Sequence, residues 1–196
     1  MSNIFNNLGL KAFRAGITPR TKESREWFRS KIKNLRNINR AQIMEEEPIK
    51  QTKNEVVGSM YMFFYDPKTK DTLPYYDRFP LVIVLGPAKG GFYGLNLHYL
   101  PPALRAKFLD ELMGITNNDK FDKTTKFDLT YNLLSRAQKL KYFKPCFKHY
   151  LSDHVKSRFA LVPATEWEIA VFLPMADFRK ANNFKVYADS KKMIGG

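Results

Sequence analysis

The chain has 196 residues, 44% of them hydrophobic and 27% charged, which is the composition of one globular domain rather than a disordered tail or a membrane protein. Its 33 Lys and Arg residues outnumber its 19 Asp and Glu residues, and the net charge of +14 favours a polyanionic partner. The single cysteine, Cys146, excludes an internal disulfide framework, and no run approaches the roughly 18 apolar residues that span a bilayer.

The excess positive charge lies in two segments of the chain. Residues 1–43 contain ten basic and two acidic residues, and residues 136–158 contain seven basic residues and one acidic residue. The remaining 16 basic and 16 acidic residues cancel. Two basic regions therefore flank a neutral middle, and each is a candidate surface for neutralising phosphates.

The first basic region predicts one long helix. Thr18 and Pro19 can supply an N-cap and a first-turn proline, and neither glycine nor a further proline follows before about Ile43. Apart from Glu26, four positions after Lys22, one helix face lacks the acidic partners at i±4 that usually accompany such cations, although a solvated face is the alternative. The candidate DNA-binding residues on this face are Lys22, Arg25, Arg29, Lys33, Arg36 and Arg40. We expect residues 1–53 to form a basic N-terminal helical arm and residues 54–196 to form the core domain.

Residues 55–100 predict strands. The apolar run at 79–86 is typical of a buried strand, and it is preceded by a strand-like segment at 55–66 and followed by another at 92–100. The glycine-rich connection at 86–91 lacks the Gly-Lys-Ser/Thr ending of a phosphate-binding loop and joins two strands, so it predicts a hairpin turn. A fourth strand at 158–163 would close a small antiparallel sheet.

Helical patterns follow and interrupt these strands. Pro101 and Pro102 open a predicted helix that places Leu104, Phe108 and Leu112 on one face. Leucines repeat at helical spacing over 125–140, and a basic helix is expected near the C-terminus. The fold class is therefore α+β, with a small antiparallel β-meander or barrel-like sheet surrounded by helices.

The second basic region alternates lysines with aromatic residues. Its candidate DNA-binding residues are Lys139, Lys141, Lys144 and Lys148. Lysines neutralise phosphates and exposed rings stack on bases, so this combination suits a nucleic-acid groove. The rings at positions 142, 143, 147, 150 and 159 have a plainer alternative role as core residues.

The residues that could support catalysis or bind a metal have simpler explanations. Asp66, Asp71 and Asp77 could hold Mg²⁺ in a nuclease, but they surround a predicted turn that itself favours aspartate. The spacing of His149 and His154 differs from that of helical zinc ligands, and Cys146 has no visible orienting partner for a thiol nucleophile. We expect no catalytic residues, no metal, no cofactor and no small-molecule substrate.

Three stretches of the sequence are familiar as strings. They are GSMYMFFYDPKTKDTLPYYDRFPLVIVLGPAKGGFYGLNLHYLPPALRAKFLDEL, YFKPCFKHYLSDHVKSRF and WEIAVFLPMADFRKANNFKVYADSKK, within roughly 57–192. With LPYYDRFPLV followed by GLNLHYLP, the chain resembles virion proteins of contractile-tailed bacteriophages of the kind labelled DNA end protector. The resemblance implies a protein that binds the ends of linear double-stranded DNA and blocks exonuclease without catalysis or cofactor.

Charge and resemblance together lead to three hypotheses. The first is a non-enzymatic virion protein that binds and protects the ends of the packaged genome. The second is a structural component of the virion neck or tail baseplate that docks on other virion proteins through its basic arm, and the third is a head-completion nuclease using the three aspartates. We expect the protein in the virion, and in the host cytoplasm during assembly, with no membrane partner.

Overall fold

The computed structural model describes residues 4–33, 35, 38–45, 51–116, 120, 122, 132, 136 and 143–195. Its strands are β1 (Gln51–Thr52), β2 (Met60–Met62), β3 (Tyr76–Asp77), β4 (Leu81–Ala88), β5 (Gly91–Asn96), β6 (Phe147–Leu151), β7 (Phe159–Val162) and β8 (Phe178–Arg179). Its α-helices are α1 (Ile4–Arg14), α2 (Lys22–Ile32), α3 (Arg40–Glu45), α4 (Pro102–Thr116), α6 (Trp167–Ala170) and α7 (Asn183–Gly195). The short 3-10 turns are η1 (Leu97–Tyr99), η3 (Ser152–His154) and η4 (Ala164–Glu166).

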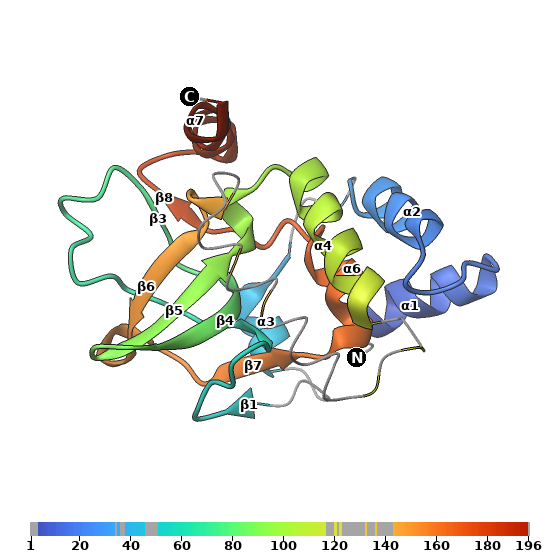
Figure 1. Cartoon of the computed structure of the whole chain (residues 1–196), viewed down its shortest axis with the longest axis horizontal. Helices are drawn as coiled ribbons and strands as arrows, with labels where there is room; N and C mark the ends of the chain where they lie inside the picture. The colour runs from blue at the N-terminus through green and yellow to red at the C-terminus, as the bar shows by residue number, and fades with distance from the viewer. Residues whose placement is uncertain are drawn as a thin grey trace.

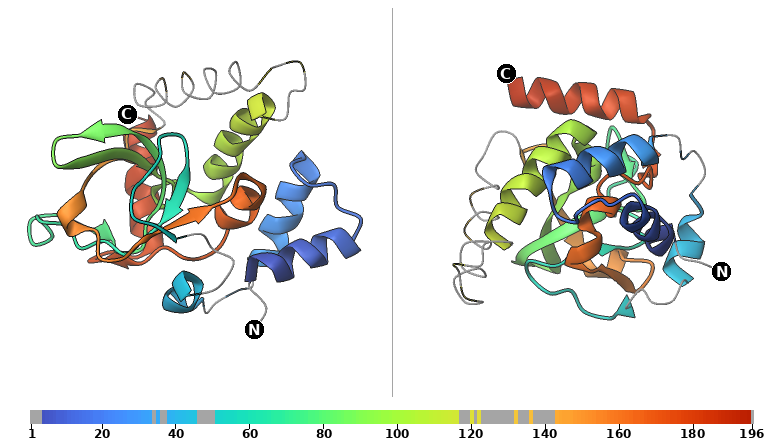
Figure 2. Two further views of the ribbon diagram at one scale, coloured as in Figure 1. Left: turned by 90° about the horizontal axis from the view of Figure 1, so that it is seen from below. Right: turned by 90° about the vertical axis from the view of Figure 1, so that its right-hand side faces the viewer.

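An antiparallel sheet of six strands in the order β1-β7-β2-β4-β5-β6 forms the centre of the molecule. A separate two-stranded sheet pairs β3 with β8. Helices α1, α2, α4 and α6 gather on one side of the large sheet, and α7 lies across one end (Figures 1 and 2). This arrangement confirms the α+β prediction.

The hairpin between β4 and β5 confirms the prediction for the glycine-rich segment. Ala88 pairs with Gly91, and Lys89 and Gly90 form the turn between them. Gly90 has a φ of 73°, a conformation that glycine adopts without a Cβ penalty. The segment therefore reverses the chain and is not a phosphate loop.

Both faces of the sheet are covered, which makes its central strands hydrophobic throughout. One face contributes Met60, Ile83 and Leu95 to the main core beneath the helices. The other face holds a second cluster of mostly aromatic residues, in which Phe63 lies 5.3 Å from Tyr150 between ring centroids. Each face of the sheet therefore supports a hydrophobic cluster of its own.

The N-terminal region departs from the prediction of one long helix. Helix α2 ends at Ile32 and α3 begins at Arg40, while Leu35 and Ile38 between them are not helical. Asn39 accepts a hydrogen bond at 3.2 Å from the Gln42 N–H, so this asparagine caps a new helix instead of continuing the first.

The predicted basic arm is not confirmed either. Phe5 of α1, Phe28 of α2 and Ile43 of α3 are at most 5% exposed and belong to the same hydrophobic cluster as the sheet residues. In Figure 1 helices α1 and α2 lie beside α4 and α6. The boundary at residues 53 and 54 stays a prediction about charge and sequence, because the helices on its N-terminal side share the core.

Outcomes for the other elements were mixed. Helix α4 contains the predicted buried residues Phe108 and Leu112, and strand β7 and helix α7 lie close to where they were expected. Helix α1 and strand β6 were missed. The helix predicted over 125–140 lies almost entirely outside the described residues.

Candidate nucleic-acid interface

Helix α2 begins three residues later than Thr18 and Pro19 had indicated. Thr21 is its N-cap: the Thr21 hydroxyl accepts a hydrogen bond from the Ser24 N–H at 3.1 Å, and the Ser24 hydroxyl accepts one from the Thr21 N–H at 3.0 Å. This reciprocal pair satisfies two of the N–H groups that a helix start leaves open. The cap fixes which α2 residues face outward.

The predicted row of cations divides into an exposed part and an inward part. Lys22, Arg29 and Lys33 are exposed, and no ion pair joins them to a carboxylate in the described part of the chain. Arg25 is only 8% exposed. Arg36 lies outside the described residues. Three free cations thus line one side of α2.

Arg25 and Arg40 are used within the fold. Arg25 forms an ion pair with Asp110 of α4, and its guanidinium lies 4.0 Å from Glu168 of α6. Arg40 donates hydrogen bonds of 2.7 Å to the carbonyls of Met175 and Ala176. Both side chains therefore join elements of the core, and neither belongs to the free row on α2.

A groove runs beside the exposed cations of α2. Arg29 and Lys33, together with Glu26 and Ser30, form one wall of a hollow of about 690 Å³ whose floor includes Pro102. A second hollow of about 260 Å³ shares Pro102 and Phe172 with the first and extends to Phe184 and Tyr187 of α7. We call these two joined hollows the α2–α7 groove.

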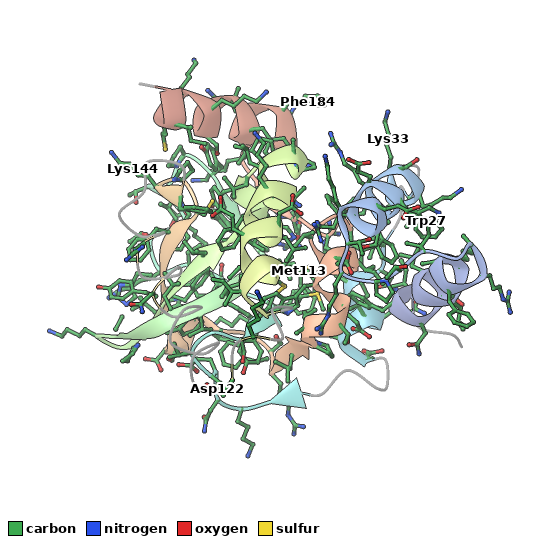
Figure 3. The ribbon with its side chains drawn as sticks, turned by 45° about the vertical axis from the view of Figure 1, so that its right-hand side comes forward. Trp27, Lys33, Met113, Asp122, Lys144 and Phe184 are labelled. Atoms are coloured by element: carbon green, nitrogen blue, oxygen red, sulfur yellow. The ribbon has the colours of Figure 1, made fainter. Side chains whose placement is uncertain are left out.

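The α7 side of the groove has an exposed ring that sequence reasoning did not single out. Phe184 is 85% exposed, more than any other large hydrophobic residue in the described chain. Figure 3 shows Phe184 and Lys33 on either side of the start of α4. In the sequence, the only signal for Phe184 is a phenylalanine placed among polar and basic residues. Helical periodicity does not show whether such a ring is exposed or buried.

The second basic region turns most of its rings inward. Phe143, Tyr150 and Phe159 are 3–8% exposed and pack in the two hydrophobic clusters. Phe147 is half-buried and stacks on Tyr93 at 5.1 Å. The core alternative that the sequence left open therefore holds for these described rings.

The lysines of this region lie apart from α2. Lys144 is exposed, whereas Lys148 is half-buried and places its ammonium 4.0 Å from the centroid of the Tyr99 ring. Lys139 and Lys141 fall outside the described residues. In Figure 3 Lys144 and Lys33 project from opposite sides of the ribbon, so the structure does not merge the two basic regions into one surface.

Comparison with known proteins decides the family. The family model described as phage T4 terminal DNA protecting protein matches residues 2–193. The chain belongs to this family. The match includes the basic first 50 residues, which the recognised strings had left out. No curated protein and no solved structure matches the chain.

The three aspartates of the nuclease hypothesis do not meet in this member of the DNA protecting family. Asp66 pairs with Lys70 at 3.0 Å on the surface, and Asp71 is exposed, whereas Asp77 is 4% exposed inside the fold. Within the described ranges, no group of three or more His, Cys, Asp or Glu side chains could hold a metal ion. The structure therefore gives the metal-dependent nuclease hypothesis no support.

Burial raises the pKa of Cys146 to about 12, so its thiol stays protonated at neutral pH.

Over the described residues, no helix combines the length and apolarity needed to cross a membrane.

Arg105 is a structural residue that sequence reasoning missed. Its guanidinium is 3% exposed and donates to the carbonyls of Leu100, Val171 and His98 and to the Tyr187 hydroxyl. These bonds connect α4 with the segments before and after it and with α7 beneath the α2–α7 groove. The α7 side of the groove is therefore joined to α4 by a buried cation.

Proposed function

We propose that this chain is a non-enzymatic virion protein that binds the ends of linear double-stranded DNA and shields them from exonuclease. Membership of the terminal DNA protecting family supports the end-binding role. The observation that supports the mechanism is the row of exposed, unpaired cations Lys22, Arg29 and Lys33. The last two of these line the α2–α7 groove, which extends to the exposed ring of Phe184.

The spacing of the cations suits a DNA backbone. Lys22 and Lys33 are 11 positions apart, which corresponds to roughly 16 Å along a helix. One DNA strand presents about five phosphates over that length. Three cations in this span neutralise phosphates without reading the sequence, which is what binding to any genome end requires.

Phe184 supplies a reason to prefer ends over internal sites. A terminal base pair exposes one flat face, whereas an internal pair is stacked on both sides. A ring that stacks on an exposed base contributes about 1–3 kcal/mol. With α2 on the phosphates and Phe184 at the terminal face, the α2–α7 groove accepts a duplex end.

An exonuclease assay tests this proposal. Linear duplex DNA is incubated with the purified protein and an exonuclease at increasing salt, and we expect shielding that falls steeply from low to moderate salt. Replacing Lys22, Arg29 and Lys33 by glutamine is expected to abolish shielding. A matched variant that neutralises the exposed cations Lys53, Lys89 and Lys156 controls for the loss of net charge. Absence of shielding at low salt contradicts the proposal.

A second candidate, assembly through contacts with other virion proteins, is favoured by helix α1. Leu10 and Phe13 are 53% and 80% exposed on this helix, next to the exposed Lys11 and Arg14. Exposed apolar side chains beside cations suit a protein contact. Phe13→Ser is expected to lower incorporation into virions and leave DNA shielding unchanged, and normal incorporation would count against this candidate.

A further inference from the structure

A pocket of about 300 Å³ lies away from the α2–α7 groove, between the loop that precedes β3 and the strands β5 and β6. Its lining is mainly polar and aromatic. It includes Tyr65, Lys68, Thr69, Tyr75, Tyr76 and Lys148. We call it the Lys148 pocket.

Lys148 is placed in this pocket without a counter-ion. Its ammonium lies 4.0 Å from the centroid of the Tyr99 ring, and no carboxylate pairs with it in the described ranges. Burial lowers the pKa of Lys148. A half-buried cation that lies over an aromatic face can still gain a strong ion pair from an anion that enters the pocket.

The one carboxylate among the lining residues is already satisfied. Asp77 accepts hydrogen bonds from the backbone N–H groups of Phe79 and Asp177 and from the side chains of Asn96 and His98, at 2.7–3.1 Å. Although burial alone would raise the pKa of Asp77, His98 and the other donors lower it, so the carboxylate stays ionised and fully bonded. The charges free to meet a ligand are therefore those of Lys148 and of Lys68 at the exposed rim.

The wall formed by the loop is held in place before any ligand arrives. The Lys180 ammonium donates to the carbonyls of Lys70, Asp71 and Leu73 at 2.6–3.2 Å. The Tyr65 hydroxyl accepts from the Leu151 N–H at 3.1 Å and thereby joins the loop to β6. A preformed pocket avoids the entropy cost of ordering its walls on binding.

We propose that the Lys148 pocket binds a terminal phosphomonoester of a DNA strand together with its nucleoside. The inference rests on the proposed function, since it names the part of the DNA end that this second site takes. The volume is at the lower end of the range for small-molecule sites, which suits one nucleotide and excludes a duplex.

Charge and lining both match this ligand. A terminal phosphomonoester approaches two negative charges at neutral pH, whereas an internal phosphodiester has one. Lys148 and Lys68 meet the phosphate, and the tyrosine rings contact the attached nucleoside. A phosphate bound here distinguishes an end from every internal position of the strand.

Binding to duplexes with different ends tests the proposal. Three duplexes, each ending in one unpaired nucleotide, carry a 5′-phosphate, a 3′-phosphate or only hydroxyl groups, and fluorescence anisotropy gives their affinities at one salt concentration. We expect the wild type to bind one phosphorylated end about tenfold more tightly than the hydroxyl end. Lys148→Met is expected to remove this preference, and Lys148→Arg to retain part of it.

Lys144→Met is the matched control, because Lys144 is exposed, lies four residues away and does not line the pocket. This variant is expected to lower the affinity for all three duplexes by the same factor. If thermal unfolding shows that Lys148→Met does not fold, Lys68→Ala at the rim takes its place and is expected to reduce the preference. Equal wild-type affinity for all three ends, or an undiminished preference in Lys148→Met, overturns the inference.

Failure of the proposed function gives a different result. If the wild type binds none of the three duplexes at low salt, DNA-end binding itself is contradicted. The pocket is then tested with a deoxynucleoside monophosphate and the matching nucleoside, by NMR shifts of residues lining the pocket. Shifts with the monophosphate that are absent in Lys148→Met support the pocket, and their absence in the wild type overturns it.

Discussion

Helix α2 carries a row of basic residues and strand β6 carries the single lysine Lys148, and the two elements present these charges differently. The α2 helix exposes Lys22, Arg29 and Lys33 along one side, beside an open groove. Strand β6 turns Lys148 toward the ring of Tyr99 and buries Tyr150 in an aromatic cluster. Basic residues of one chain thus form an extended exposed row in one place and line a small pocket in another.

The backbone geometry explains the difference. Helix residues four or seven apart share a side, so Lys22, Arg29 and Lys33 make one row. Strand residues alternate between faces, and Lys148 therefore shares the face of Tyr150 rather than that of Phe147 and His149. The cations of α2 therefore lie on the surface, whereas Lys148 of β6 packs against an aromatic ring.

The largest expected effect concerns the packing of β6. A Cβ on Gly91 would lie 1.8 Å from the Tyr150 carbonyl oxygen, so Gly91→Ala must force β5 and β6 apart. We expect the free energy of unfolding to fall by about 3 kcal/mol in denaturant titrations. Gly86→Ala, whose Cβ meets nothing within 4 Å, is expected to change it by less than about 0.5 kcal/mol. Equal stability of both variants would show that β6 does not depend on this close approach.

Arg25 and Arg29 provide the next test, because they lie one turn apart on α2. Arg25→Met leaves the 1%-exposed Glu168 without its nearby cation, and we expect a loss of about 2 kcal/mol with little change in the salt dependence of DNA binding. Arg29→Met is expected to preserve stability and to reduce the salt slope by about 1. The reverse pattern would place the phosphate contact on the inward side of α2.

Phe184→Ala tests the aromatic part of the end site. Because the ring is 85% exposed, the unfolding free energy is expected to change by less than about 0.5 kcal/mol. Affinity for duplex ends is expected to fall about tenfold, measured by anisotropy on short duplexes, while binding to circular DNA stays the same. Met193→Ala on the same helix, 47% exposed and not aromatic, serves as the control. An equal effect of both variants would remove the stacking role.

A smaller effect is expected from pH. Burial lowers the pKa of His98 despite its hydrogen bond to Asp77, so near pH 6 the unfolded chain takes up a proton that the folded chain does not. Stability should therefore decrease as pH falls, by less than about 1 kcal/mol between pH 7 and pH 6. His98→Gln is expected to remove this part of the slope in denaturant titrations, with His149 and His154 common to both proteins. An unchanged slope would contradict this account, because it would mean that His98 takes up its proton alike in the folded and unfolded chain.

The sequence predicted the elements whose pattern is local. The β4–β5 hairpin and helix α4 follow from apolar runs, glycines and a proline pair close together in the chain. The break between α2 and α3 was missed because no proline or glycine marks it. The residue that ends the continuity is Asn39, which caps α3. Strand β6 was missed because its pairing with β5 joins segments more than 50 residues apart, and its lysines and rings had suggested a groove.

For the candidate site, the sequence predicted which residues share a helix face and not which of them are exposed. Helical periodicity correctly identified a face containing Lys22, Arg29 and Lys33, but it could not show that Arg25 is paired with Asp110, 85 positions away. The exposure of Phe184 depends on how α7 crosses the end of the sheet. Local spacing identifies which residues share a side, and only the tertiary fold determines whether that side is free.

The most direct test of the account is the salt dependence of DNA-end binding by the variant in which Lys22, Arg29 and Lys33 are glutamine. Affinity is measured for one short linear duplex at several salt concentrations, beside the wild type and the variant lacking Lys53, Lys89 and Lys156. The account predicts that the slope of log affinity against log salt becomes shallower by about 3 in the α2 variant and changes little in the control. An α2 variant with the wild-type slope would contradict the central claim that this helix face binds the phosphates.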